Sequence, residues 1–110
     1  MYAERRVGYI AAVIERLRVN GSTVAVTFRV PHAAGAQTVA LCGDFNDWSP
    51  TSHPMVPDDN DGSFTVTVRL TIGRDYRFRY LIDGARWEND WAADRYEPNA
   101  YGGDDSVIAL

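Results

Sequence analysis

The sequence predicts an all-β domain, an antiparallel β-sandwich preceded by a short N-terminal helix. From residue 23 onward, several short segments alternate apolar with polar residues, as half-buried strands do. Turn-forming residues separate these segments, and no second block of helical periodicity follows. The chain has 110 residues, which suffices for one domain with one core.

The N-terminal part is predicted to form a helix over residues 3–18, because apolar residues recur there at steps of three and four. These residues are Val7, Ile10, Ile14 and Leu17. The pair Asn20-Gly21 supplies a stop. A helix of this length is marginal alone in water, so its apolar stripe needs its own domain or another chain as a partner. We expect a helical extension over residues 1–20 and a sandwich domain over residues 21–110.

Four segments have the two-residue period of a strand. They are residues 23–30, Thr38–Gly43, Ser63–Leu70 and Tyr76–Ile82. Pro31 ends the first segment, because proline cannot donate to a sheet ladder. The second segment is more apolar, which favours a central position in its sheet.

A long loop is predicted over residues 44–62, because it contains three prolines and the turn-forming run Asp58–Gly62. That run has a faint similarity to a calcium loop but lacks the ligand spacing and the terminal glutamate. His32 and His53 have no companions at metal-ligand spacing. We therefore expect a charged turn and no metal site.

The C-terminal third begins with a hairpin-type turn at Asp83-Gly84, after which Trp87 starts a short edge strand. Residues 92–105 are rich in Asp, Asn, Pro and Gly, which predicts an extended loop. The last strand is expected over Ser106–Leu110, either near the sheet centre or tied at one edge.

Charge and composition exclude several classes of function. The formal net charge is −4, which argues against nucleic acid or an anionic membrane as the partner. No apolar run approaches the roughly 20 residues of a membrane span. The N-terminus lacks a clear small-residue cleavage site, so no signal peptide is expected. Cys42 is the single cysteine and cannot form an internal disulfide, so we expect a small buried side chain and a cytoplasmic protein.

The most informative stretch is LCGDFNDWSP, residues 41–50. Its spacing allows Phe45 to face inward as an anchor while Trp48 faces outward. A flat indole beside Asn46 and Asp47 suits a sugar, which has an apolar face next to hydroxyl groups. The alternative is that Trp48 packs in the core.

Four stretches together resemble a known family: VALCGDFNDWSP, DGSFTVTVRL, YRFRYLIDGARWENDW and PNAYGGDDSVIAL. They are similar to the glycogen- and starch-binding module of the isoamylase N-terminal type, carbohydrate-binding module family 48. The same module occurs in the β subunit of AMP-activated protein kinase and in glycogen-branching and debranching enzymes. The resemblance covers about residues 23–110. It implies an immunoglobulin-like antiparallel β-sandwich that binds α-1,4-glucan without catalysis.

The resemblance also implies a set of sugar-contacting residues. Its members are Trp48, Trp87 and Tyr101 as stacking rings and Arg79 and Asp105 as hydrogen-bonding groups. To this set we add Asn89, in the polar segment after Trp87, as an extra contact. Three features depart from the family pattern. Arg79 replaces the usual lysine and offers a planar fork. One additional residue precedes Trp87. Asp105 replaces the usual asparagine and only accepts hydrogen bonds when ionised.

Three of these residues also have a structural alternative. Trp87 could pack against the sheet edge, and Arg79 could belong to a solvated strand face with Arg77 and Arg69. Trp91, in a polar segment, could extend the platform, but packing in the core or at the edge is favoured. Tyr101, beside two glycines, could cover the mouth of the sandwich.

Two functions follow from this sequence. The first is a non-catalytic glucan-binding module without cofactors, alone or as an accessory of a glucan-processing enzyme or a kinase-type partner. Catalysis is not expected, because no nucleophile motif occurs and Asp104-Asp105 lie in a wet loop that would not raise a pKa. The second is an interaction or regulatory subunit whose N-terminal helix docks on a partner chain or on its own copy.

Overall fold

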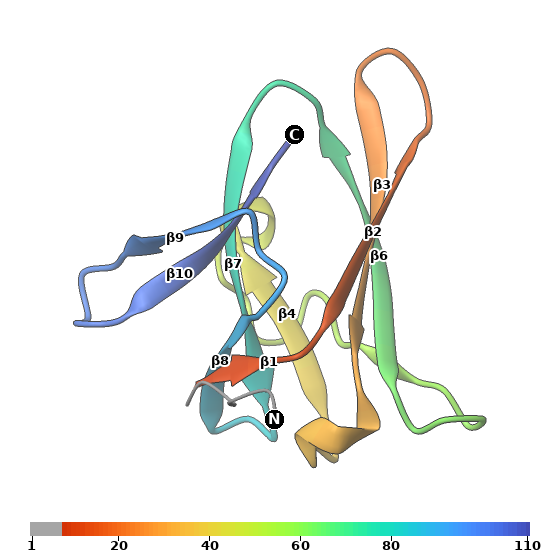
Figure 1. Ribbon diagram of the computed structural model, residues 1–110, viewed down its shortest axis with the longest axis vertical. Helices are drawn as coiled ribbons and strands as arrows, with labels where there is room; N and C mark the ends of the chain where they lie inside the picture. The colour runs from red at the N-terminus through yellow and green to blue at the C-terminus, as the bar shows by residue number, and fades with distance from the viewer. Residues whose placement is uncertain (1–7) are drawn as a thin grey trace, which may run out of the picture.

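The computed structural model describes residues 8–110, which form two β-sheets that pack face to face (Figure 1). The larger sheet has the order β1 (Tyr9–Ile10), β8 (Arg86–Asp90), β7 (Asp75–Ile82), β10 (Asp104–Ala109) and β9 (Arg95–Pro98), and β4 (Val39–Gly43) also pairs with β7. The smaller sheet has the order β2 (Val13–Arg18), β3 (Thr23–Val30), β6 (Phe64–Thr71) and β5 (Val56–Pro57). Two 3₁₀ turns, η1 (His32–Ala34) and η2 (Asp44–Asn46), complete the elements.

The core lies between the two sheets and follows from the alternation of their strands. Every second residue of β3 is buried, ending with Phe28 and Val30. On β7 the buried positions are Tyr76, Phe78 and Tyr80, and the ring of Phe78 meets that of Phe28 edge-on at 5.1 Å. The prediction of an all-β sandwich is therefore confirmed, and four predicted strands agree with β3, β4, β6 and β7 to within one residue at each end.

The predicted N-terminal helix is wrong over the part that the structure describes. Residues 9–10 and 13–18 are strands, and β2 pairs with β3 along its whole length. Ile10 is buried in the larger sheet and Ile14 packs from the smaller one. Their four-residue spacing arises because the chain crosses from one sheet to the other, and not from a helical turn. Residues 3–7 of the prediction lie outside the described residues.

Two further predictions need correction. The strand that carries Trp87 is not at an edge, because β8 pairs with β7 on one side and in parallel with β1 on the other. The loop predicted over residues 92–105 contains β9, and β10 begins at Asp104, two residues before the predicted start. Sequence reasoning missed β9 because its four residues include Glu97 and Pro98, which are poor strand formers.

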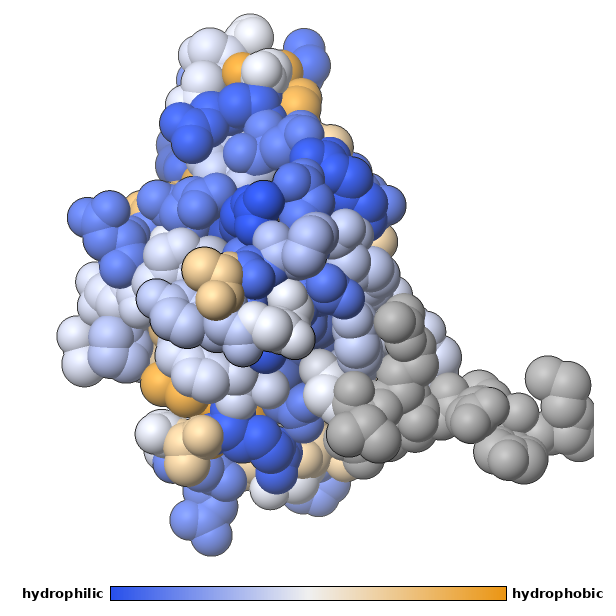
Figure 2. Space-filling model, turned by 90° about the vertical axis from the view of Figure 1, so that its left-hand side faces the viewer, coloured by the Kyte–Doolittle hydropathy of each residue, from blue (hydrophilic) through white to orange (hydrophobic). Residues whose placement is uncertain are grey.

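The surface on the side of β9 and β10 is mostly hydrophilic, with small separated apolar spots (Figure 2). Scattered apolar side chains of this kind are normal on a protein surface. None of the helices between residues 8 and 110 has the length and hydropathy of a membrane span.

Candidate functional site

A cleft of about 630 Å³ lies over the outer face of the larger sheet, where β7, β8, β10 and two loops meet. Its walls bring together aromatic, cationic and hydrogen-bonding side chains. The lining residues are Trp48, Arg77, Arg79, Trp87, Asn99, Tyr101 and Asp105. The strand period explains the floor, since Arg77 and Arg79 alternate with the core residues of β7 and must face away from the core.

Trp48 reaches the cleft because the loop after β4 is held in a tight conformation. Asp47 and Trp48 both adopt left-handed backbone geometry, with φ of 54° and 58°. Such geometry costs about 1 kcal/mol or more per residue outside glycine, so surrounding bonds must enforce it. Asn46 does so: its side-chain oxygen accepts from the Gly43 amide at 3.0 Å, and its Nδ2 donates to the Leu41 carbonyl at 2.9 Å.

Phe45 anchors this loop from below, as predicted. Its ring packs against the core and stacks with Phe28 at 6.5 Å. Position 43 requires glycine, because a Cβ there would lie 2.5 Å from the Arg77 carbonyl oxygen and 2.8 Å from the Phe45 ring. Phe45 and Gly43 thus fix the position of the Trp48 loop relative to the sheet.

Cys42 lies buried next to this loop. It pairs with Arg79 across the strands, and its thiol donates to the Ser49 carbonyl at 3.3 Å. Burial raises the pKa of the Cys42 thiol above its ordinary value. Cys42 is not part of the core between the sheets, so it belongs to the base on which the Trp48 loop rests.

Arg79 and Trp87 form the second part of the site. The guanidinium carbon of Arg79 lies 5.8 Å from the centroid of the Trp87 ring, within range of a cation–π contact. Trp87 remains 39% exposed. Among residues 8–110 no carboxylate pairs with Arg79, and its Nε is buried without a hydrogen-bond partner. The charge of this side chain is therefore not neutralised within the described structure.

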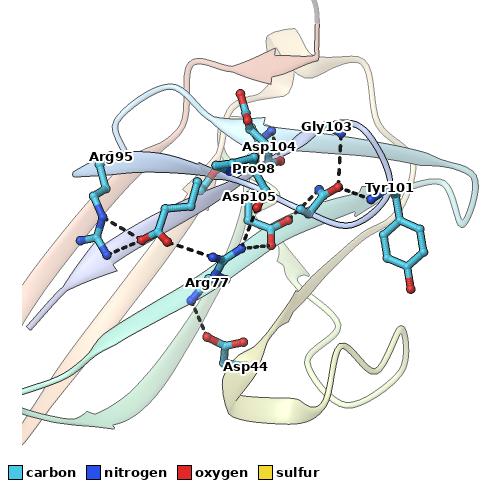
Figure 3. A network of polar contacts seen from close by, with 12 residues as sticks. Asp44, Arg77, Arg95, Pro98, Tyr101, Gly103, Asp104 and Asp105 are labelled. Atoms are coloured by element: carbon cyan, nitrogen blue, oxygen red, sulfur yellow. Dashed lines mark hydrogen bonds and ion pairs between the residues drawn. The ribbon is translucent and has the colours of Figure 1, made fainter.

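Arg77 differs, because carboxylates hold it in place (Figure 3). Its NH1 donates to Asp105 and to the Pro98 carbonyl, each at 3.3 Å, and its NH2 donates to Glu97 at 2.9 Å. Arg95 binds the other oxygen of Glu97. The hydrogen bond from Arg95 is the largest cause that lowers the pKa of Glu97, so Glu97 stays ionised and keeps Arg77 fixed.

Asn99 organises the loop that carries Tyr101. Its side-chain oxygen accepts from the amides of Tyr101 and Gly103, at 2.9 and 3.2 Å, and its Nδ2 donates to Asp105 at 3.1 Å. The Tyr101 ring points away from this network (Figure 3) and is 93% exposed. Asn99 thus ties the Tyr101 loop to the cleft, while the tyrosine ring itself has space to move.

The structure brings five of the six predicted site residues to the cleft: Trp48, Arg79, Trp87, Tyr101 and Asp105. Asn89 does not line it. That residue is only 4% exposed, and its amide donates to the Asp104 carbonyl while its oxygen accepts from Ser106.

Sequence reasoning missed Arg77 and Asn99 as lining residues. The signal for Arg77 was its position two residues before Arg79, which places both side chains on one strand face. The signal for Asn99 was an asparagine two residues before Tyr101, the spacing of an Asx turn.

The arrangement suits a ligand that has both an apolar face and hydroxyl groups. The indoles offer flat apolar surfaces, the arginines donate hydrogen bonds, and Asp105 accepts them. Within residues 8–110, no group of three or more His, Cys, Asp or Glu side chains is placed to hold a metal ion.

Comparison with known proteins adds two findings. The family model described as Carbohydrate-binding module 48 (isoamylase N-terminal domain) matches residues 17–100. The 1,4-alpha-glucan-branching enzyme of Saccharomyces cerevisiae is 38% identical over 60 residues, which is 54% of this chain. That match spans only 8% of the enzyme's own length. Because the family model covers most of the chain, the protein belongs to the carbohydrate-binding module 48 family.

Proposed function

We propose that this chain is a non-catalytic module that binds α-1,4-glucan in the cleft over β7. The observation that carries the proposal is that Trp48, Trp87 and the unpaired Arg79 all line one cleft. The family match supports a carbohydrate ligand. The name of the similar enzyme, which refers to 1,4-alpha-glucan, supports this class of carbohydrate.

The physical roles follow from the surface of a glucose unit. The rings of Trp48 and Trp87 cover apolar C–H faces, and water leaves both surfaces on contact. Arg79 donates to the hydroxyl groups at the ring edge. Asp105 accepts from them with the carboxylate lone pairs that Arg77 and Asn99 leave unused. Tyr101 closes over the bound glucan from the exposed loop, which requires only a movement of its own ring and backbone.

The affinity should be weak, because the cleft is open and several groups must become ordered. The favourable contacts less these costs leave a Kd on the order of micromolar to millimolar. Arg77 adds little to the cost of ordering, because Glu97 and Asp105 already hold its side chain in the free chain.

Isothermal titration of the full chain with maltoheptaose tests the proposal. We expect saturable binding that Trp48→Ala removes. Trp91→Ala is the control, because Trp91 is also a partly exposed tryptophan but lines a different and smaller pocket. Absence of binding at millimolar ligand, or equal loss in both variants, would contradict the proposal.

A role as accessory to a larger glucan-processing enzyme is a second candidate. Its support is that the similar stretch occupies 8% of the length of the branching enzyme. The version in which an N-terminal helix docks on a partner does not hold for residues 8–18, because they form the strands β1 and β2 with a short link between them. Co-purification of the full chain with a glucan-active enzyme from the source cell tests this candidate, and a chain that elutes alone would contradict it.

A further inference from the structure

The strand that carries Trp87 is only half supported by its neighbour β7. The β7–β8 pairs are Tyr80–Glu88, Leu81–Trp87 and Ile82–Arg86. Beyond them, β7 pairs with β10 instead, starting at Phe78–Ser106. The second half of β8, residues 89 and 90, therefore needs other partners to keep its place.

Strand β1 supplies one of them from outside the stretch that matches the family model. It pairs in parallel with β8, and the backbone N–H of Asn89 donates to the Gly8 carbonyl at 2.7 Å. The Trp91 amide donates to the Ile10 carbonyl at 2.8 Å. Ile10 is 2% exposed, so β1 is itself fixed in the core.

The side chain of Asn89 supplies the other support. Its Nδ2 donates to the Asp104 carbonyl at 2.8 Å, and its Oδ1 accepts from the Ser106 hydroxyl at 2.7 Å. The Ser106 oxygen in turn accepts from the Asp90 amide at 2.9 Å. These bonds join the end of β8 to the start of β10, in a place where the two strands share no ladder.

Both joined strands carry residues of the cleft next to the junction. Trp87 lies two residues before Asn89 on β8, and Asp105 lies between the two residues that Asn89 binds on β10. A shift at this junction would therefore change the separation of the Trp87 ring and the Asp105 carboxylate. A direct contact of Asn89 with a sugar is unsuitable, because its side chain is buried and, unlike Asp105, does not line the cleft.

We infer that Asn89 is a positioning residue, which holds the Trp87 ring and the Asp105 carboxylate at the spacing that a glucan requires. The inference rests on the proposed function for its ligand, but the position of Trp87 can be measured without any ligand. The geometry assigns β1 the same task from the opposite side of β8.

Asn89→Asp in the full chain is the sharpest variant. It keeps the shape and the bond from Ser106 but replaces the Nδ2 donor with an acceptor facing the Asp104 carbonyl. We expect the Kd for maltoheptaose to weaken about fivefold or more, the scale of one buried hydrogen bond. Ser106→Ala breaks the same junction from β10 and should act in the same direction.

Ser63→Ala is the matched control. Ser63 is also buried and hydrogen-bonded, to Arg29 and Asp61, but it lies beside the smaller sheet. This variant should lower the melting temperature and leave the Kd unchanged. Loss of affinity in proportion to lost stability in all three variants would mean a purely structural role and would overturn the inference.

The second readout is iodide quenching of Trp87 in a full chain with Trp48→Phe and Trp91→Phe. We expect Asn89→Asp to change the quenching constant and Ser63→Ala to leave it unchanged. An unchanged constant overturns the inference, even if glucan affinity falls. If the unsubstituted chain binds no glucan, the proposed function fails, while the quenching result still decides whether Asn89 positions Trp87.

Discussion

The outer faces of the two sheets have similar strand patterns but carry different surfaces. On the smaller sheet, the exposed threonines Thr27 and Thr67 bond to each other at 2.7 Å, and Arg69 lies opposite Ala25. On the larger sheet, Arg79 lies at the base of a cleft walled by tryptophans. Both faces therefore present an arginine on a long strand. The difference lies in what surrounds the arginine: Trp48, Trp87 and Tyr101 line the cleft together with Arg79.

A second comparison lies within the cleft, between the two arginines of β7. Arg77 is held by Asp105 and Glu97, whereas Arg79 has no carboxylate partner among the described residues. The Arg77 guanidinium therefore supports the walls of the cleft, whereas the Arg79 guanidinium is open to a ligand. The neighbours of a residue, and not its place in the strand alternation, decide whether its side chain is free to bind a ligand.

The largest effect is expected from removing an aromatic wall. Trp48→Ala should abolish retention of the full chain on amylose, because central tryptophans of a binding site commonly contribute about 2 kcal/mol or more. The fold should survive, since Phe45 and not Trp48 anchors the loop to the core. Affinity electrophoresis through amylose measures this retention. Retention of Trp48→Ala equal to that of the unsubstituted chain would mean that the cleft on the larger sheet is not the glucan-binding face.

The next effect separates the arginines of the two sheets. Arg79→Ala should weaken maltoheptaose binding about tenfold, because hydrogen bonds from charged donors contribute roughly 1.5–3 kcal/mol. Arg69→Ala changes the same residue type on the smaller sheet and should leave the Kd unchanged. Titration calorimetry of both variants decides the matter. Equal Kd values for the two would show that the cleft does not set the binding surface.

Arg77→Ala should act through its neighbours. Removing the guanidinium leaves Asp105, which is 6% exposed, without its ion pair, so both stability and affinity should fall. Arg79→Ala should lower affinity with little loss of melting temperature. Thermal unfolding and titration calorimetry of both variants distinguish the supporting role of Arg77 from the ligand-binding role of Arg79. A larger loss of melting temperature in Arg79→Ala than in Arg77→Ala would exchange these roles.

A smaller effect is expected at Tyr101. Its ring is almost fully exposed in the free chain, so Tyr101→Ala should not lower the melting temperature. Binding of a long glucan should weaken by about 0.5–1.5 kcal/mol, the range of one aromatic stacking contact. Maltotriose is too short to reach the rim and should be unaffected. Equal losses for both ligands would place Tyr101 at the centre of the site.

The smallest effect concerns pH. Arg95 lowers the pKa of Glu97 in the folded chain, so this group stabilises the fold above the unfolded pKa of about 4.3 and loses that contribution as pH falls through its lowered value. The melting temperature should therefore fall in acid, and less steeply in Glu97→Gln. Thermal scans of both chains between pH 3 and pH 7 measure how steeply the melting temperature falls. Identical slopes would mean that Glu97 does not hold Arg77 through its charge.

The sequence predicted the strands that alternate strictly, because one side of each is buried against the opposing sheet. It failed at the N-terminus, where the spacing of Ile10 and Ile14 fits both a helix and a chain that crosses between sheets. Only the pairing of β2 with β3 distinguishes these, and that pairing depends on residues far away in the chain.

Prediction of the site depended on the resemblance for Trp87, Arg79 and Tyr101. Local pattern alone explained Phe45 and Trp48, whose spacing across a turn sends them to opposite sides. Asn89 was expected among the sugar contacts because it is polar and close to Trp87 in the chain. Its burial comes from β1 and β10, whose contacts with β8 no local pattern reveals.

The buried thiol of Cys42 has a practical consequence. Its hydrogen bond to Ser49 places the one sulfhydryl of the chain in contact with the loop that carries Trp48. An alkylating reagent can reach the sulfur only when that segment lifts, so the rate of alkylation records how often it opens. The alkylation rate of Cys42 therefore measures the motion of the Trp48 loop. A saccharide that lowers this rate would reveal that it occupies the cleft, without any added label.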